Sequence, residues 1–170
     1  PEWNRAIHVV EPFKIPSNWT KFRACDYGYG SYTGVVWIAV SPSEQLVVYR
    51  ELYCSKVTAT DLADMVLEAE AEDGTIRYGV LDSSLWHKRG DTGPSLAEQM
   101  NMKGCRWRPS DRSRGSRVAG KNEMHRRLQV DEHTEEPRLV FFANCTNTIA
   151  QLPSIPLDKR NPEDVDTNAE

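Results

Sequence analysis

Paired cysteines, long apolar runs and a secretory leader are all missing from this sequence of 170 residues. The four cysteines lie far apart, with no Cys-x-x-Cys pair, which argues against a zinc ribbon or a disulfide scaffold and favours reduced thiols. The longest apolar run, residues 35–40, is far shorter than the ~18 residues that a membrane helix needs. Residues 1–5 lack the basic and then apolar pattern of a signal peptide. We therefore expect a cytosolic chain without a membrane partner.

The composition is that of an ordinary globular domain, but its charge is unevenly distributed. Hydrophobic residues make up 39% and charged residues 27%, and the net charge is −4. Between residues 103 and 127, nine bases stand against two acids, so this segment carries about +7 and the remainder about −11. A basic stripe on an acidic body is typical of a polyanion-binding surface, although a solvated helix face beside a charged loop would look the same.

The expected secondary structure changes from consecutive strands to strands that alternate with helices. After an extended lead-in over 1–20, we expect strands over 22–29, 34–40 and 45–53, a helix from a Thr60 cap to Gly74, a strand over 78–82, a helix from a Ser95/Glu98 capping box to Gly104, a short strand over 105–108, a helix over 116–129 and a strand over 138–144. This order predicts an α/β fold: a mixed sheet, antiparallel in its first three strands and then parallel, flanked by helices. The ribonuclease-H-like fold has this order, and other mixed folds share it.

Two aspartates stand at the ends of predicted strands. Asp26 ends the first strand, just before two glycines, and Asp82 ends the fourth. If these strands are neighbours, both carboxylates leave the sheet side by side, and a divalent cation would remove their repulsion. Such oxygen ligands suit Mg²⁺ or Mn²⁺, and two ions about 3.5–4 Å apart would drive hydrolysis of a phosphodiester. The alternative is that both residues are turn or cap residues.

Six short motifs occur in order along the chain: CDYGY (25–29), VYRELY (48–53), GVLDSSLW (79–86), RVAGK (117–121), FANC (142–145) and NPEDVDT (161–167). Together they resemble the C-terminal nuclease domain of the large terminase subunit of tailed bacteriophages and prophages, over nearly the whole chain. The resemblance implies a ribonuclease-H-like, metal-dependent endonuclease that cuts concatemeric double-stranded DNA during genome packaging. It also implies an ATPase domain, a small terminase subunit and a portal ring as partners, in the cytoplasm of the bacterial host.

The resemblance assigns roles to individual acids. Asp26 matches the first metal ligand of the family and Asp82 the second. The third ligand lies near the C-terminus in the family, and Asp166 is the expected residue here. Asp164 and Glu170 are alternatives, as is an acid beyond Glu170. Two further accessory residues are expected: Glu51, which would line the same site or pair with a base such as Arg50, and His87, which would carry protons.

The basic segment contains a near match to a nucleotide-binding loop. Residues 115–122 depart from it because Asn122 stands where Ser or Thr should bind Mg²⁺, and because a polar stretch precedes it. We therefore expect no nucleotide in this domain. Phosphate contacts with duplex DNA are expected instead from four bases: Arg112, Arg114, Arg117 and Lys121. Trp107 would stack on DNA or pack beneath the stripe, and the four histidines are expected at the surface.

The domain organisation and two competing functions complete these expectations. Residues 1–20 are expected to join a missing ATPase domain, residues 21–157 to form the nuclease domain, and residues 158–170 to form an acidic segment that carries the third ligand. One alternative is a ribonuclease-H-like resolvase or transposase, which would prefer branched DNA. The other is a non-catalytic module that docks DNA or a portal ring.

Overall fold

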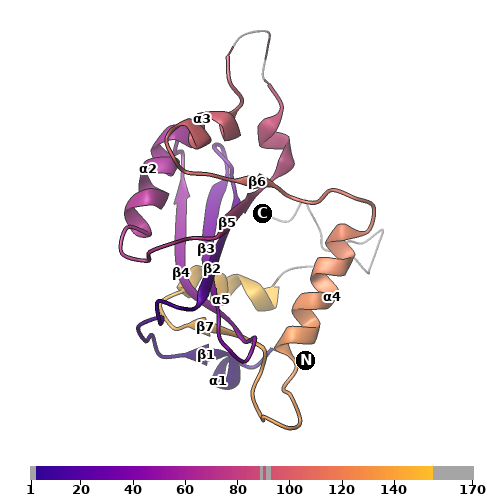
Figure 1. Ribbon diagram of the computed structural model, residues 1–170. Coiled ribbons are helices and arrows are strands. Elements are labelled where there is room, and N and C mark those ends of the chain that lie inside the picture. The colour runs from indigo at the N-terminus through magenta and orange to yellow at the C-terminus, as the bar shows by residue number, and fades with distance from the viewer. Residues whose placement is uncertain (1–2, 89, 91–92, 155–170) are drawn as a thin grey trace.

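A single mixed sheet forms the centre of the molecule in a computed structural model that describes residues 3–88, 90 and 93–154 (Figure 1). Over these residues the strand order is β1-β7-β4-β3-β2-β5-β6. The strands are β1 Val9–Val10, β2 Thr20–Asp26, β3 Tyr32–Val40, β4 Leu46–Ser55, β5 Tyr78–Leu81, β6 Arg108–Pro109 and β7 Leu139–Phe142. The helices are α1 Arg5–His8, α2 Ala59–Ala69, α3 Leu96–Met102, α4 Ser116–Leu128 and α5 Thr146–Gln151, with 3-10 turns η1 Ser83–Trp86 and η2 Leu152–Ser154.

The strand directions confirm the predicted mixed sheet. β2, β3 and β4 pair in antiparallel fashion as consecutive hairpins. β5 then pairs parallel to β2 and β6 parallel to β5, while β7 pairs parallel to β4 on the other side. The expected helices over the middle of the chain occur as α2, α3 and α4. No helix among the described residues has the length and apolar character to cross a lipid bilayer.

The two faces of the sheet differ because successive side chains of a strand point to opposite sides. On β2 and β3, Arg23, Cys25, Val35 and Trp37 are buried on the face that α2 covers, which we call the α2 face. The residues between them, Ala24 and Val36 among them, belong to the opposite face and are only half-buried. Asp26 shares that second face, which we call the acid face. Figure 1 shows α2 and α3 on one side of the sheet and α4 on the other.

The lead-in expected over residues 1–20 is partly built into the fold. Residues 5–8 form α1, and Val9–Val10 add a parallel edge strand beside Phe141 and Phe142 of β7. His8, expected at the surface, is fully buried: Nδ1 lies 2.8 Å from the Asn4 carbonyl oxygen and Nε2 2.7 Å from that of Leu128. Both ring nitrogens thus have backbone partners, and the His8 side chain links α1 to the end of α4.

Other differences concern element boundaries. The first strand ends at Asp26, the short strand expected over 105–108 starts only at Arg108, and the cap of α2 is Thr58 rather than Thr60. Helix α5 is absent from the expected elements. The capping box of α3 is present as predicted, since Ser95 accepts from the Glu98 amide and the Glu98 carboxylate accepts from the Ser95 amide.

Candidate metal centre at the end of strands β2 and β5

The two predicted aspartates stand at adjacent positions on neighbouring strands. Cys25 of β2 pairs with Leu81 of β5 in a parallel ladder. The next residues in the chain are Asp26, which ends β2, and Asp82, which follows the end of β5. Cys25 and Leu81 are both buried on the α2 face, so the following residues both turn to the acid face. Neighbouring strands lie about 4.8 Å apart, which sets the scale of the separation between the two Cα atoms. Rigid strands therefore bring two carboxylates to one edge of the sheet.

Asp82 is held at this edge by the turn that follows it. Its Oδ1 accepts a hydrogen bond of 2.8 Å from the Ser84 amide and so caps η1, while the Ser83 amide donates to Ser110 Oγ at 3.2 Å. The hydrogen bonds from Ser84 hold the pKa of Asp82 below its ordinary value, and the charges of Arg112 and His87 lower it further. The carboxylate is thus ionised at neutral pH, as a metal ligand must be. The backbone cap uses Oδ1, and a carboxylate has a second oxygen, so capping is compatible with a ligand role.

The chain returns to the same edge after β6. The Ser110 amide donates to the Leu81 carbonyl at 2.8 Å, so the loop beginning at residue 110 starts beside Asp82. Asp111 fixes this loop by accepting from both the amide and the hydroxyl of Ser113. Arg112 Nη2 consequently lies 4.0 Å from Asp82 Oδ1, with both side chains substantially exposed. The structure thus places one of the four predicted DNA-binding residues next to a candidate ligand.

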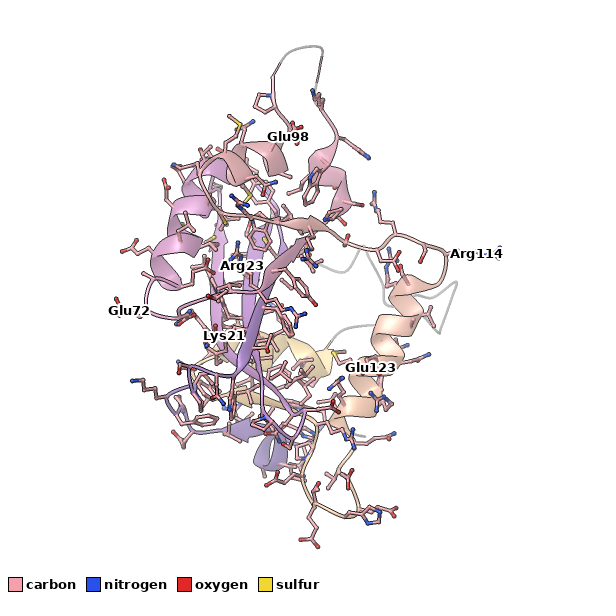
Figure 2. The ribbon with its side chains drawn as sticks, in the orientation of Figure 1. Lys21, Arg23, Glu72, Glu98, Arg114 and Glu123 are labelled. Carbon is pink, nitrogen blue, oxygen red and sulfur yellow. The ribbon has the colours of Figure 1, made fainter. Side chains whose placement is uncertain are left out.

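The other three predicted cations continue away from the acids. Arg114 lies in the loop before α4, at the outer edge of the molecule (Figure 2), while Arg117 and Lys121 are on the first turns of α4. At the other end of α4, Arg126 and Arg127 are both paired with Glu123 at 2.7 Å. Of these four predicted cations, Arg112 is therefore the one that the structure places in contact range of an acid of the candidate site.

Glu51 does not join the two aspartates. It shares the acid face, yet it lies two strands from β2, opposite Val36 of β3. Its carboxylate accepts four hydrogen bonds of 2.7–3.0 Å, from the amides and side chains of Asn147 and Thr148 at the start of α5. The expected pairing with Arg50 is wrong, because Arg50 points to the α2 face and pairs with Asp73 at 2.9 Å.

Three other expectations have separate outcomes. His87 follows η1, is exposed, and interacts through its charge with Asp82. Trp107 is 6% exposed and packs under Arg23, with the guanidinium 4.4 Å from the ring centre, so it belongs to the core rather than to a stacking surface. Asp166, Asp164 and Glu170 lie outside the described residues. Within the described part, no three acidic, histidine or cysteine side chains gather as a metal site.

The two aspartates are oxygen donors of the kind that hard divalent cations take, and they fit such an ion as two members of a larger ligand set. They do not complete that set by themselves, because an all-protein cage for such an ion needs more oxygen ligands than two carboxylates provide. The donor chemistry therefore agrees with a site for Mg²⁺ or Mn²⁺ that draws further ligands from water, substrate or another acid.

Comparisons with known proteins give a consistent structural answer. No protein-family model and no curated protein matches the chain. Among solved structures it is similar to the large terminase nuclease domain of phage P22, with a TM-score of 0.69 and 14% identity over 98% of this chain and 82% of that one. It is also similar to the large terminase of a thermophilic bacteriophage in complex with ATP-γ-S, with a TM-score of 0.75 and 12% identity over 97% of this chain.

The lengths and ligands of these proteins differ. The match covers only 39% of the terminase chain that holds ATP-γ-S. A third similar structure, the large terminase nuclease of the thermophilic phage G20c, contains bound zinc and has a TM-score of 0.57 and 13% identity over 88% of this chain and 84% of that one. At sequence identities this low, the structural similarity establishes the fold alone. The chain has the ribonuclease-H-like fold of the nuclease domains of phage large terminases.

Proposed function

We propose that this domain is a metal-dependent DNA endonuclease of a phage or prophage large terminase, cutting concatemeric double-stranded DNA during genome packaging. The observation that carries the proposal is the position of Asp26 and Asp82 at the ends of two neighbouring parallel strands. Two carboxylates in this position favour a divalent cation, and the fold agrees with that of phage nuclease domains.

The proposed ligands are Asp26, Asp82 and a third acid, Asp166, with Asp164 and Glu170 as the alternatives. Two Mg²⁺ or Mn²⁺ ions would activate water and neutralise charge at the scissile phosphate. The chain itself orients Asp82 through the Ser84 amide and keeps it ionised. Arg112, beside Asp82, and the bases that follow it would hold phosphates of the same strand.

The wider assembly follows from the same proposal. The domain would work beside a terminase ATPase domain, which the comparison with the longer terminase in complex with ATP-γ-S supports. The small terminase subunit and the portal ring would be further partners, and the cytoplasm of the bacterial host would be the place of action. The nuclease site would cut DNA that the ATPase moves past it.

The test is cleavage of supercoiled plasmid with Mn²⁺, with Mg²⁺ and with EDTA. We expect nicking and linearisation only with metal, and a loss of at least about 100-fold in Asp26→Asn and in Asp82→Asn, since each change removes a charged ligand. Mn²⁺ binding followed by electron paramagnetic resonance should weaken in the same two variants. Asp61→Asn is the matched control, because Asp61 is an exposed acid on α2, on the opposite side of the sheet.

The possible outcomes separate the competing functions. Metal-independent cleavage, or equal activity in Asp26→Asn and Asp61→Asn, would contradict the proposed site. A folded protein that binds DNA but cuts none with either metal would support the non-catalytic docking module. Cleavage of branched DNA in preference to plain duplex would support the resolvase alternative.

A further inference from the structure

Two tyrosines stack on one another at the open end of the β3–β4 hairpin, opposite the turn that joins the two strands. The rings of Tyr32 and Tyr53 are 4.7 Å apart between centres and only 10° from parallel. Tyr32 is 63% exposed and Tyr53 36% exposed, so the outer residue of the pair, Tyr32, is largely open to solvent and Tyr53 is partly so. Because Tyr53 already covers one side of the Tyr32 ring, an exposure this high means that the other side is open. The pair presents a flat aromatic surface to the solvent.

The sheet register places this aromatic pair in line with the candidate metal site. Asp26 of β2 pairs with Gly34 of β3, and Gly34 pairs with Tyr53 of β4. Directly opposed residues share a face, so Tyr53, Gly34 and Asp26 form one row across the acid face. Asp82, the residue that follows β5, lies beyond the Asp26 end of this row. Tyr32 lies two residues before Gly34 and therefore shares the same face. The tyrosines and the acids thus face the same side of the sheet.

The position between the aromatic pair and the acids is open in the described part of the chain. Gly34 has no side chain, and a Cβ built there would meet no described atom within 4 Å. Two strand spacings separate Tyr53 from Asp26 along the row, about 10 Å. A stacked DNA strand advances about 3.4 Å per nucleotide, so this distance spans at most about three nucleotides. A strand whose phosphate lies at the acids would carry a base within about three positions over the tyrosines.

From this arrangement we infer that Tyr32 and Tyr53 form a binding site for an unpaired nucleobase of the DNA strand being cut. The inference rests on the proposed function for its choice of ligand. In a duplex the faces of the bases are covered by their neighbours, so an open aromatic face is usable only by a base that has left the stack. Such stacking is independent of base identity, because every base has a π-face. The site would therefore favour locally unpaired DNA without reading its sequence.

A hydroxyl group helps to hold one ring, but the stacking surface is formed by the rings themselves. Gln151 of α5 donates a hydrogen bond of 3.1 Å to Tyr53 Oη, which helps to fix the Tyr53 ring. The Tyr32 ring is held by stacking on the Tyr53 ring, as in other cross-strand aromatic pairs. Removing the rings should therefore abolish base stacking, whereas removing only the hydroxyl groups should preserve it.

The test is DNA binding measured by fluorescence anisotropy in EDTA, so that cleavage plays no part. The probes are a labelled single strand, the same strand in a duplex, and the same single strand with abasic sites. We expect the double variant Tyr32→Ala/Tyr53→Ala to bind the single strand roughly 5- to 150-fold more weakly, the range that one stacked base provides. Duplex binding should change less than about twofold. Tyr32→Phe/Tyr53→Phe, the matched control, should bind like the wild type.

The abasic probes show whether a base is the ligand. Wild type should lose affinity for a strand with abasic sites by the same factor, and the alanine variant should not distinguish that strand from the intact one. Equal losses for single strand and duplex, or a loss that persists with abasic DNA, would overturn the inference. Unchanged DNA binding with an altered melting temperature or oligomeric state would also overturn it and would identify a protein contact. Failure of the proposed function is distinct, since a wild type that binds none of the probes would contradict DNA as the substrate.

Discussion

The buried pair of Arg23 and Glu70 supports the strand that carries Asp26, and its removal makes a strong test of that support. Arg23 Nη1 lies 2.7 and 2.9 Å from the two carboxylate oxygens of Glu70, and the Trp37 indole donates to the same carboxylate at 2.9 Å. The side chains of the pair are only 5% and 10% exposed. Glu70→Ala would leave the guanidinium of Arg23 buried without its counter-charge. We expect the free energy of unfolding to fall by about 3–5 kcal/mol.

The assay is urea unfolding at neutral pH, with thermal unfolding as a second measure. In a domain of this size each kcal/mol lowers Tm by about 2–4 °C, so the expected fall is roughly 6–20 °C. Glu72→Ala is the control, because Glu72 is an exposed acid near the same helix end and lies at the rim of the molecule, far from the central Arg23 (Figure 2). It should change stability by less than about 0.5 kcal/mol. A loss below about 1 kcal/mol in Glu70→Ala would show that water reaches Arg23 and that the pair does not fix β2.

Two further predictions concern other supports of the site. Burial alone would raise the pKa of Glu51, but its hydrogen bonds from Asn147 and Thr148 outweigh this and lower the pKa below 4.5. Ionised Glu51 therefore contributes its full stabilisation above about pH 4.5, and this contribution is lost as the pH falls through the lowered pKa. Glu51→Gln should cost about 1–2 kcal/mol near pH 6 in chemical unfolding, and a gap to wild type that stays constant down to about pH 3 would refute this. At Gly79 an added Cβ would lie 2.7 Å from the Trp107 ring, so Gly79→Ala should lose about 1–3 kcal/mol, whereas Gly34→Ala, in open space, should lose none. Equal melting temperatures for the two glycine variants would contradict the packing argument.

The parts of the fold that can be predicted from sequence are those in which one strand or helix shows its own period. The apolar runs of β3, β5 and β7 and the capping box of α3 are signals of this kind, and β5 leads directly to Asp82. Strand β1 cannot be predicted because two residues gain their strand conformation only from β7 beside them. Helix α5 escapes prediction for a similar reason, since its first amides are satisfied by Glu51, which is 96 residues earlier in the chain.

The error at Glu51 has a definite physical cause. Arg50 and Glu51 are adjacent in sequence, which favours an ion pair on a loop but forbids one on a strand, where adjacent side chains point to opposite faces. A single sequence also does not define the register between strands. For this reason the row of Tyr53, Gly34 and Asp26 cannot be recognised from sequence, although each residue lies in one of the strands expected from it.

The alternation along β2 separates what holds the domain together from what it is proposed to do. Lys21 and Arg23 are buried on the α2 face, and Arg23 contacts the core through Glu70 and Trp107. Asp26, three residues later, is exposed on the acid face at the end of the same strand. Substitutions on the α2 face should therefore lower stability and activity together, because they move the strand. Substitutions of Asp26 or Tyr32 should change metal or DNA binding while Tm stays within a few degrees, since neither side chain is part of the core.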